Sequence, residues 1–121
     1  MMHVYSARLD GQTSYNTGDS FRYLTATYNP ESNCSGLSFS VPYTGMVEVS
    51  ASAVISGGSV SVKKTGSSSD TKFLFGCPPG NTQNGSGSCL IVCVGGDLLT
   101  VNVNNALTVH NGYGTVVYKM R

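Results

Sequence analysis

Residues 46–56 show the clearest alternation of apolar and polar side chains in the chain. One face carries Val47, Val49, Ala51, Ala53 and Ile55, and the other carries Glu48, Ser50, Ser52 and Ser56, with Val54 as the exception. A period of two sustained over this length predicts a β-strand with one buried face and does not fit a helix. Pro42 has no N–H to donate and Gly45 permits a chain reversal, so we expect a turn before this strand.

Further short segments have the composition and period of strands. They are residues 3–9, 21–28, 59–64, 71–75, 89–94, 98–103, 107–109 and 114–120. The Gly57-Gly58 pair predicts a hairpin in which residues 59–64 pair antiparallel with the long strand. Residues 89–94 are apolar on both faces, which predicts a central strand covered on both sides.

The connections between these segments are rich in glycine and asparagine, and no helical period of convincing length is present. Residues 76–87 form the longest irregular segment, and a loop of this length is typically functional or mobile. Many short strands joined by tight turns indicate an all-β antiparallel sandwich, most simply a jelly roll. We expect the 121 residues to form one domain, residues 1–121.

Composition excludes several classes of partner. Charged residues make up 11% of the chain and the formal net charge is +1, whereas about 25% of an ordinary soluble domain is charged. The basic residues are scattered, so we expect no nucleic-acid binding. The first residues lack a basic segment followed by an apolar run, and no window has the length of a membrane span. We therefore expect synthesis in a cytoplasm without a signal peptide or membrane insertion.

The four cysteines, Cys34, Cys77, Cys89 and Cys93, contain no CxxC pair. Cys89 and Cys93 would lie on one face of a strand about 13 Å apart, at roughly 3.3 Å per residue, which is too far for a disulfide. We expect buried free thiols, with a Cys77–Cys89 bridge as the alternative. His3 and His110 stand at no recognised spacing for zinc ligands.

The residue pattern favours binding over catalysis. No Gly-x-Ser-x-Gly segment accompanies His110, and no carboxylate pair stands in an apolar context, so we predict that the protein is not an enzyme. Candidate binding residues are those of the expected loops. They are Tyr15, Tyr43, Asn81, Gln83, Asn84 and Tyr113.

Three segments, in order and spacing, resemble the globular C1q domain of the C1q and tumour-necrosis-factor jelly-roll superfamily. They are Phe-Ser-Val-Pro-Tyr-Thr-Gly at 39–45, the small-residue strand with Gly-Gly-Asp and its successor at 88–103, and Tyr-Gly-Thr-Val-Val-Tyr at 113–118. The resemblance covers nearly the whole chain. It departs from the family at Met46, Val47 and Val49, where aromatic residues are usual, and no collagen-like segment precedes the domain.

The resemblance implies a homotrimer that acts by binding. Versions without a stalk occur in bacteriophages as capsid decoration proteins, head fibres and fibre tips, so we expect a virion surface protein made in the host cytoplasm. Its expected partners are a capsid or tail protein and a host cell-surface glycan or receptor. The alternative is a soluble, lectin-type carbohydrate- or receptor-binding module outside a virion. No cofactor is expected, except that the resemblance leaves open a calcium ion near the trimer top held by Asp97 and Asp10.

Overall fold

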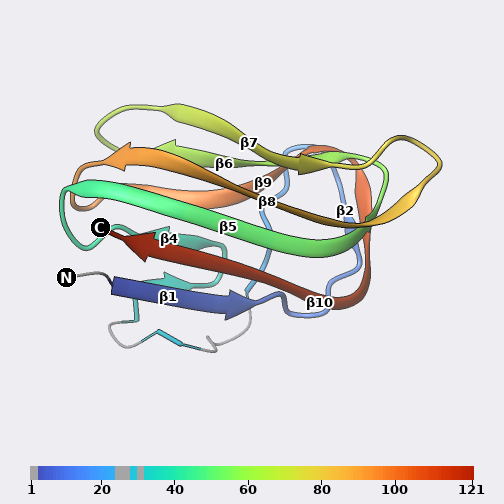
Figure 1. Ribbon diagram of the computed structural model, residues 1–121, viewed down its shortest axis with the longest axis horizontal. Helices are drawn as coiled ribbons and strands as arrows, with labels where there is room; N and C mark the ends of the chain where they lie inside the picture. Colours follow the sequence, from blue (N-terminus) through green and yellow to red (C-terminus); the bar gives the residue numbers. More distant parts are fainter. Residues whose placement is uncertain (1–2, 24–27, 30–31) are drawn as a thin grey trace.

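The computed structural model describes residues 3–23, 28–29 and 32–121, and of residues 111–113 it describes the backbone alone. The described residues form strands in two stacked sheets and no helix (Figure 1). The strands are β1 His3–Arg8, β2 Ser14–Tyr15, β3 Cys34–Ser35, β4 Ser38–Ser40, β5 Gly45–Ser56, β6 Ser59–Thr65, β7 Asp70–Gly76, β8 Thr82–Cys93, β9 Leu98–Asn105 and β10 Leu107–Met120. No helix among these residues is long and apolar enough to cross a bilayer.

Each sheet is antiparallel and draws its strands from distant parts of the chain. One sheet, here called the β5 sheet, has the order β1-β10-β5-β8, with β2 paired to β10. The other, the β6 sheet, has the order β3-β4-β9-β6-β7. The chain therefore changes sheet after β2, β4, β5, β7, β8 and β9. These crossings make the sandwich, and the predicted all-β antiparallel class is confirmed.

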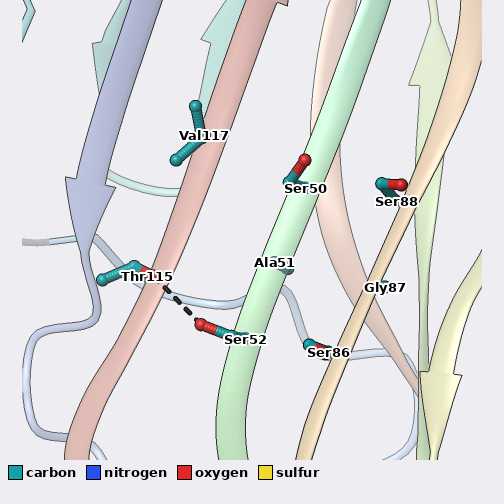
Figure 2. A pocket seen from close by; sticks show the side chains of 8 residues that line it. All are labelled: Ser50, Ala51, Ser52, Ser86, Gly87, Ser88, Thr115 and Val117. Carbon is teal, nitrogen blue, oxygen red and sulfur yellow. Dashed lines mark hydrogen bonds between the residues drawn. The ribbon is translucent and has the colours of Figure 1, made fainter.

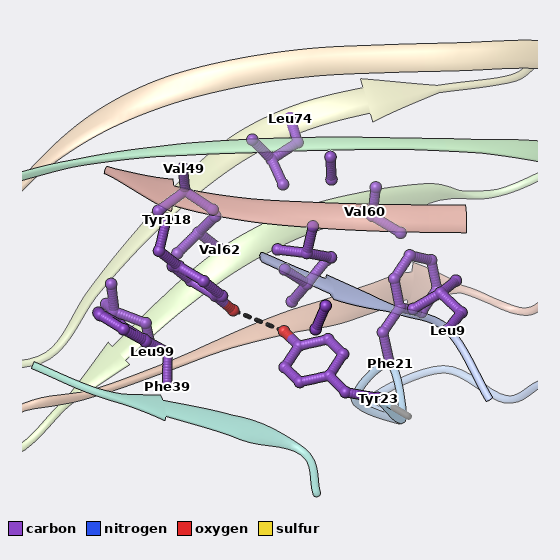
Figure 3. Close-up of a cluster of buried hydrophobic side chains, with 14 of the residues drawn as sticks. Leu9, Phe21, Tyr23, Phe39, Val49, Val60, Val62, Leu74, Leu99 and Tyr118 are labelled. Atoms are coloured by element: carbon purple, nitrogen blue, oxygen red, sulfur yellow. Dashed lines mark hydrogen bonds between the residues drawn. The ribbon is translucent and has the colours of Figure 1, made fainter. Parts of the chain in front are cut away.

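The core lies between the sheets and is rich in aromatic rings (Figure 3). Tyr118 stacks on Phe39 with ring centroids 4.4 Å apart, and its hydroxyl lies 2.5 Å from the hydroxyl of Tyr23. The predicted inward face of β5 is confirmed, because Val47, Val49 and Ile55 are fully buried. Every second residue of this central strand thus anchors the β5 sheet to the core.

The predicted hairpin at Gly57-Gly58 is wrong. β5 pairs with β10 and β8, whereas β6 pairs with β7 and β9 in the opposite sheet. Both glycines have positive φ, 66° and 72°. A Cβ on Gly58 would lie only 2.6 Å from the carbonyl oxygen of Asn105. The pair is therefore a tight crossing between sheets, where glycine is needed both for its backbone angle and for its lack of a side chain.

The irregular segment predicted at 76–87 is shorter than expected, because β8 begins at Thr82. Two glycines of this segment, Gly85 and Gly87, belong to β8 and face inward where β7 lies against it. A Cβ on Gly87 would lie 1.9 Å from the carbonyl oxygen of Leu74, and one on Gly85 would lie 2.5 Å from the ring of Phe75. These glycines allow the two sheets to close on each other at this edge.

The strand predicted at 89–94 exists, but it lies at the edge of its sheet and is not central. β8 pairs with β5 alone within the β5 sheet. Ile91 and Cys93 point into the core, while Leu90 and Val92 are 46% and 64% exposed. The apolar character of both faces therefore does not come from two covering layers within one chain.

The other expected strands are found with small changes of length. Residues 59–64, 71–75 and 98–103 correspond to β6, β7 and β9, and the two segments expected after residue 106 form a single β10 with an irregular pairing between His110 and Thr115. In the predicted strand 21–28, isolated bridges pair Tyr23 with Leu9 and Tyr28 with Ser6, and residues 24–27 lie outside the described residues.

All four cysteines are free thiols, so the alternative Cys77–Cys89 bridge is not formed. Burial raises the pKa of Cys34 from 9.0 to about 12 and that of Cys93 to about 11. A thiol held protonated in this way is a poor nucleophile. These two cysteines serve as small core residues, as expected.

Candidate assembly face and loop cluster

The outward face of the β5 sheet carries two adjacent rows of small side chains. Alternation and register align Thr115, Ser52 and Ser86 in one row and Val117, Ser50 and Ser88 in the next. These six residues, with Ala51 and Gly87 below them, line a hollow of about 390 Å³ (Figure 2). Five of the six outward side chains are hydroxyls, and Ser52 Oγ lies 3.1 Å from Thr115 Oγ1. The hollow is uncharged, and it is shallow because only short side chains line it.

An apolar ridge lies on the same face, closer to the end of the sheet where β5 begins. It consists of Met46, Leu90 and Val92, which are 39%, 46% and 64% exposed. Met46 pairs directly with Val92, and Leu90 is two residues away along β8. Single exposed apolar side chains are ordinary, but neighbouring ones on one sheet face mark an interaction surface.

A small ionic group lies beside the ridge, where Glu48 of β5 pairs with Leu90 of β8. Glu48 accepts from Arg121 at 3.1 Å and lies 4.0 Å from Lys119. All three side chains are partly exposed, so the pairs contribute little to stability. Because the opposite charges lie together, this part of the face keeps only a small local charge.

The free edge of β8 next to the ridge is covered by the chain itself. Lys64 is buried and its ammonium donates to the carbonyl oxygen of Val92 at 2.9 Å. Asp97 accepts from the backbone N–H of Val94 and from the N–H and hydroxyl of Ser67. These hydrogen bonds, most of all that from the Ser67 backbone, lower the pKa of Asp97 below 3.8. Covered edges of this kind oppose strand addition, so the ridge offers its side chains for packing and not its backbone.

A polar cluster occupies the opposite end of the same face. Ser56 Oγ lies 2.6 Å from Thr82 Oγ1 and 2.6 Å from His110 Nε2. A serine and a histidine at this distance satisfy the first requirement of a nucleophile and its base. A third group that orients the imidazole is also required, and the described residues place no carboxylate in hydrogen-bond contact with His110. The polar cluster can thus bind a hydroxyl-bearing or amide-bearing ligand, but among the described residues it lacks the orienting third group of a catalytic triad.

Comparison with known proteins was made by sequence and by structure. No protein-family model and no curated protein matches the sequence. Among solved structures, murine APRIL at pH 8.0 superposes with a TM-score of 0.69 at 14% identity over 100% of both chains. The globular domain of zebrafish complement 1qA gives 0.61 at 15% identity over 97% of this chain and 94% of its own. The Eiger TNF of S. frugiperda gives 0.59 at 12% identity over 99% and 92%.

The fold is a C1q/TNF-like jelly roll. At these identities the likeness establishes the fold alone. It confirms the fold that the resemblance of the sequence implied, and it leaves the activity of this jelly roll to be argued from its own residues.

Within this jelly roll, three of the expected binding residues lie near one another. Asn81, Gln83 and Asn84 are all exposed at the β7–β8 connection and the start of β8. Asn84 pairs with Val54, which in turn pairs with His110. The backbone carbonyl of Asn81 accepts from the N–H of Gly57. The Asn84 amide therefore borders the polar cluster, whereas Gln83 pairs with the buried Ile55 and alternates to the other face of β8.

The expected tyrosines are not brought together. Tyr15 is 2% exposed in β2 and packs on Phe21 with ring centroids 5.1 Å apart, so it is a core residue and not a ring presented to a partner. Tyr43 is half-buried and meets the ring of His3 at 5.6 Å. The side chain of Tyr113 lies outside the described residues.

The two acids considered for calcium already have partners. Asp10 accepts from the backbone N–H of Gln12 and lies 3.6 Å from Arg22, and Asp97 is bonded as described above. Among the described residues, no three His, Cys, Asp or Glu side chains gather into a metal-binding group.

Sequence reasoning missed the hollow and the position of the ridge. The signal for the ridge was present, since residues 89–94 are apolar on both faces. The pattern does not distinguish a second covering layer from the same chain from one supplied by a neighbouring subunit, so it does not place the strand at an edge. The hollow had no signal of its own, because serine on the outward face of a strand is also typical of a simple solvated surface.

Proposed function

We propose that this jelly roll is a non-enzymatic binding protein that assembles as a homotrimer through the outward face of its β5 sheet. The observation that carries the proposal is the apolar ridge of Met46, Leu90 and Val92 beside an uncharged hollow on that face. Burying exposed aliphatic side chains at about 25 cal/mol per Å² favours association. A neighbouring hollow lined by short side chains gives such a ridge a place to pack.

The arrangement allows a cyclic assembly. The ridge and the hollow occupy neighbouring parts of the face, so the ridge of one copy can pack into the hollow of the next. Such a contact between two different surfaces, repeated around an axis, closes a ring. The number three comes from the resemblance to C1q and tumour-necrosis-factor domains.

The finer part of the proposal concerns where the trimer acts. We infer that it is displayed on the surface of a bacteriophage particle as a capsid decoration or head or tail fibre protein. One end would hold a capsid or tail protein, and loops at the other end would meet the host surface. Support comes from the fold, from the low charge and from four free thiols, which suit assembly in a reducing cytoplasm.

Light scattering coupled to size-exclusion chromatography tests the assembly. The unchanged protein should have three times the chain mass of 12.7 kDa. The double variant Leu90→Ser and Val92→Ser should give a folded monomer. Leu98→Ser is the matched control, because Leu98 is 42% exposed but lies on the β6 sheet, and it should remain trimeric. A monomeric unchanged protein at micromolar concentration would refute the assembly.

The virion role is tested separately by mass spectrometry of particles purified from a lysate on a density gradient. The protein should comigrate with the capsid proteins in a fixed ratio. If it stays in the soluble fraction while particles are intact, the virion role is wrong even when the trimer is correct.

A second function is favoured by the exposed amides near the polar cluster. Asn81, Gln83 and Asn84 suit a soluble carbohydrate- or receptor-binding module outside a virion. This alternative predicts ligand binding that is lost in Asn84→Ala together with His110→Ala, and no association with particles.

A further inference from the structure

The outward face of the β6 sheet carries an exposed aromatic ring among uncharged polar side chains. Phe73, on β7, is 63% exposed. Ser59, Ser61 and Asn104 lie beside it on β6 and β9. We propose that these four residues, called here the Phe73 platform, bind a neutral oligosaccharide.

The register of the sheet brings the ring to this position. Phe73 pairs with Ser61, and the pairing of β6 with β7 is irregular at Val60–Ser61. The irregularity turns both Leu74 and Phe75 inward while Phe73 stays outside. The tip of the ring lies over Gly76, where a Cβ would be 3.5 Å from Phe73 Cζ and 3.2 Å from Ser59 Cβ. Because Gly76 has no side chain, the ring can lie close to the sheet while 63% of Phe73 stays exposed.

Hydrogen bonds prearrange the polar part of the platform. The amide nitrogen of Asn104 donates to Ser59 Oγ at 3.0 Å and to Ser61 Oγ at 2.8 Å. Ser61 is 4% exposed and serves to hold the amide in place, whereas the half-buried Ser59 can turn its hydroxyl proton toward a ligand. Among the described residues no donor reaches the side-chain oxygen of the exposed Asn104. The platform thus offers one donor and one acceptor beside an apolar ring.

This combination matches the chemistry of a sugar. One face of a pyranose presents C–H groups that pack on an aromatic ring, and its edge presents hydroxyls that both donate and accept. Lys63 is the next outward residue of β6, and the nearby Asp70 and Lys72 lie 3.8 Å from each other as an ion pair. A single exposed cation gives little selection for an acidic ligand, so a neutral one fits better.

A peptide strand fits this place less well. Peptide addition needs a free backbone edge, and β7 is the edge strand of its sheet. The Leu74 carbonyl oxygen is already covered by β8, since a Cβ on Gly87 would be 1.9 Å from it. The platform is therefore a surface of side chains.

The platform lies on the sheet opposite the proposed assembly face (Figure 1). Assembly through the β5 sheet would leave it exposed in each copy, and several weak sites on one particle would bind a glycan-covered surface by avidity. The site itself does not depend on assembly, because all four residues belong to one chain.

The test is a two-dimensional amide NMR titration with three neutral probes, cellotetraose, chitotetraose and mannotetraose. At least one should shift the signals of residues 59–61, 73 and 104. Phe73→Ala should weaken binding by about tenfold or more, as is usual for a central aromatic contact. Phe73→Trp should retain binding, Asn104→Ala should weaken it, and the control Leu98→Ala should leave it unchanged.

Several outcomes would overturn the proposal. They are no shift with any of the three probes, binding that Phe73→Ala leaves intact, or binding of a sulfated oligosaccharide alone that is lost in Lys63→Ala. Failure of this proposal and failure of the assembly are distinguishable. Phe73→Ala should stay trimeric, and the Leu90→Ser, Val92→Ser monomer should still bind the probe.

Discussion

Gly87 gives the sharpest test of how the two sheets close. In the structure a Cβ at this position would stand 1.9 Å from the carbonyl oxygen and 2.7 Å from the carbonyl carbon of Leu74. Both atoms belong to the backbone of β7, which cannot rotate away as a side chain can. Gly87→Ala must therefore push β7 and β8 apart. We expect a loss of about 3 kcal/mol or more, at or above the upper end for overpacking of a core.

The measurement is urea unfolding followed by circular dichroism, made in the Leu90→Ser, Val92→Ser background so that subunit exchange does not contribute. Ser88→Ala is the control. It is the next residue of β8, it faces outward, and its side chain only loses an oxygen, so it should change the free energy of unfolding by less than about 0.5 kcal/mol. If Gly87→Ala were equally mild, the close approach of β7 and β8 would be wrong.

Three further changes probe the core, the edge and the assembly face. Tyr118→Phe leaves the buried hydroxyl of Tyr23 without its partner and should cost about 1–3 kcal/mol in urea unfolding. Burial raises the pKa of both tyrosines above 10.0, so the unfolded chain loses protons first and unchanged protein should lose stability as pH rises above 10. Asp97→Asn should lower the melting temperature at pH 7. Because the pKa of Asp97 is lowered from 3.8, its contribution is present above that pH and lost as pH falls through the lowered value, so the difference should shrink in acid. Ser50→Arg should give a folded monomer by light scattering, and a trimer would contradict the place of the hollow in assembly.

The sequence was sufficient for most of the longer strands and for the buried face of β5, but not for the short strands β2, β3 and β4. The alternation of residues 46–56 is a local property of the chain, and local periodicity survives whatever the strand pairs with. Which strands pair with each other is not a local property of the chain. Gly57-Gly58 is consistent with a hairpin or with a crossing between sheets, and only the approach of Asn105 to Gly58 decides it.

The candidate sites show the same difference between local properties, which the sequence reveals, and non-local ones, which it does not. Exposure of Asn81, Gln83 and Asn84 was predictable from their composition and from the turn signals around them. The burial of Tyr15 was not, because a two-residue strand paired to β10 has no period to reveal it. The Phe73 platform depends on the irregular pairing of β6 with β7, which the pattern of apolar residues does not predict.

The two faces of β8 serve the fold and the proposed assembly respectively. Its inward glycines are explained within one chain, because β7 lies directly against them. Its outward Leu90 and Val92 are not explained by one chain, since they face solvent beside a hollow of serines. An edge strand that only needed to remain soluble would carry charged residues at these two positions. Aliphatic residues there, next to a covered backbone edge, are accounted for when the second layer over β8 is another copy of the same chain.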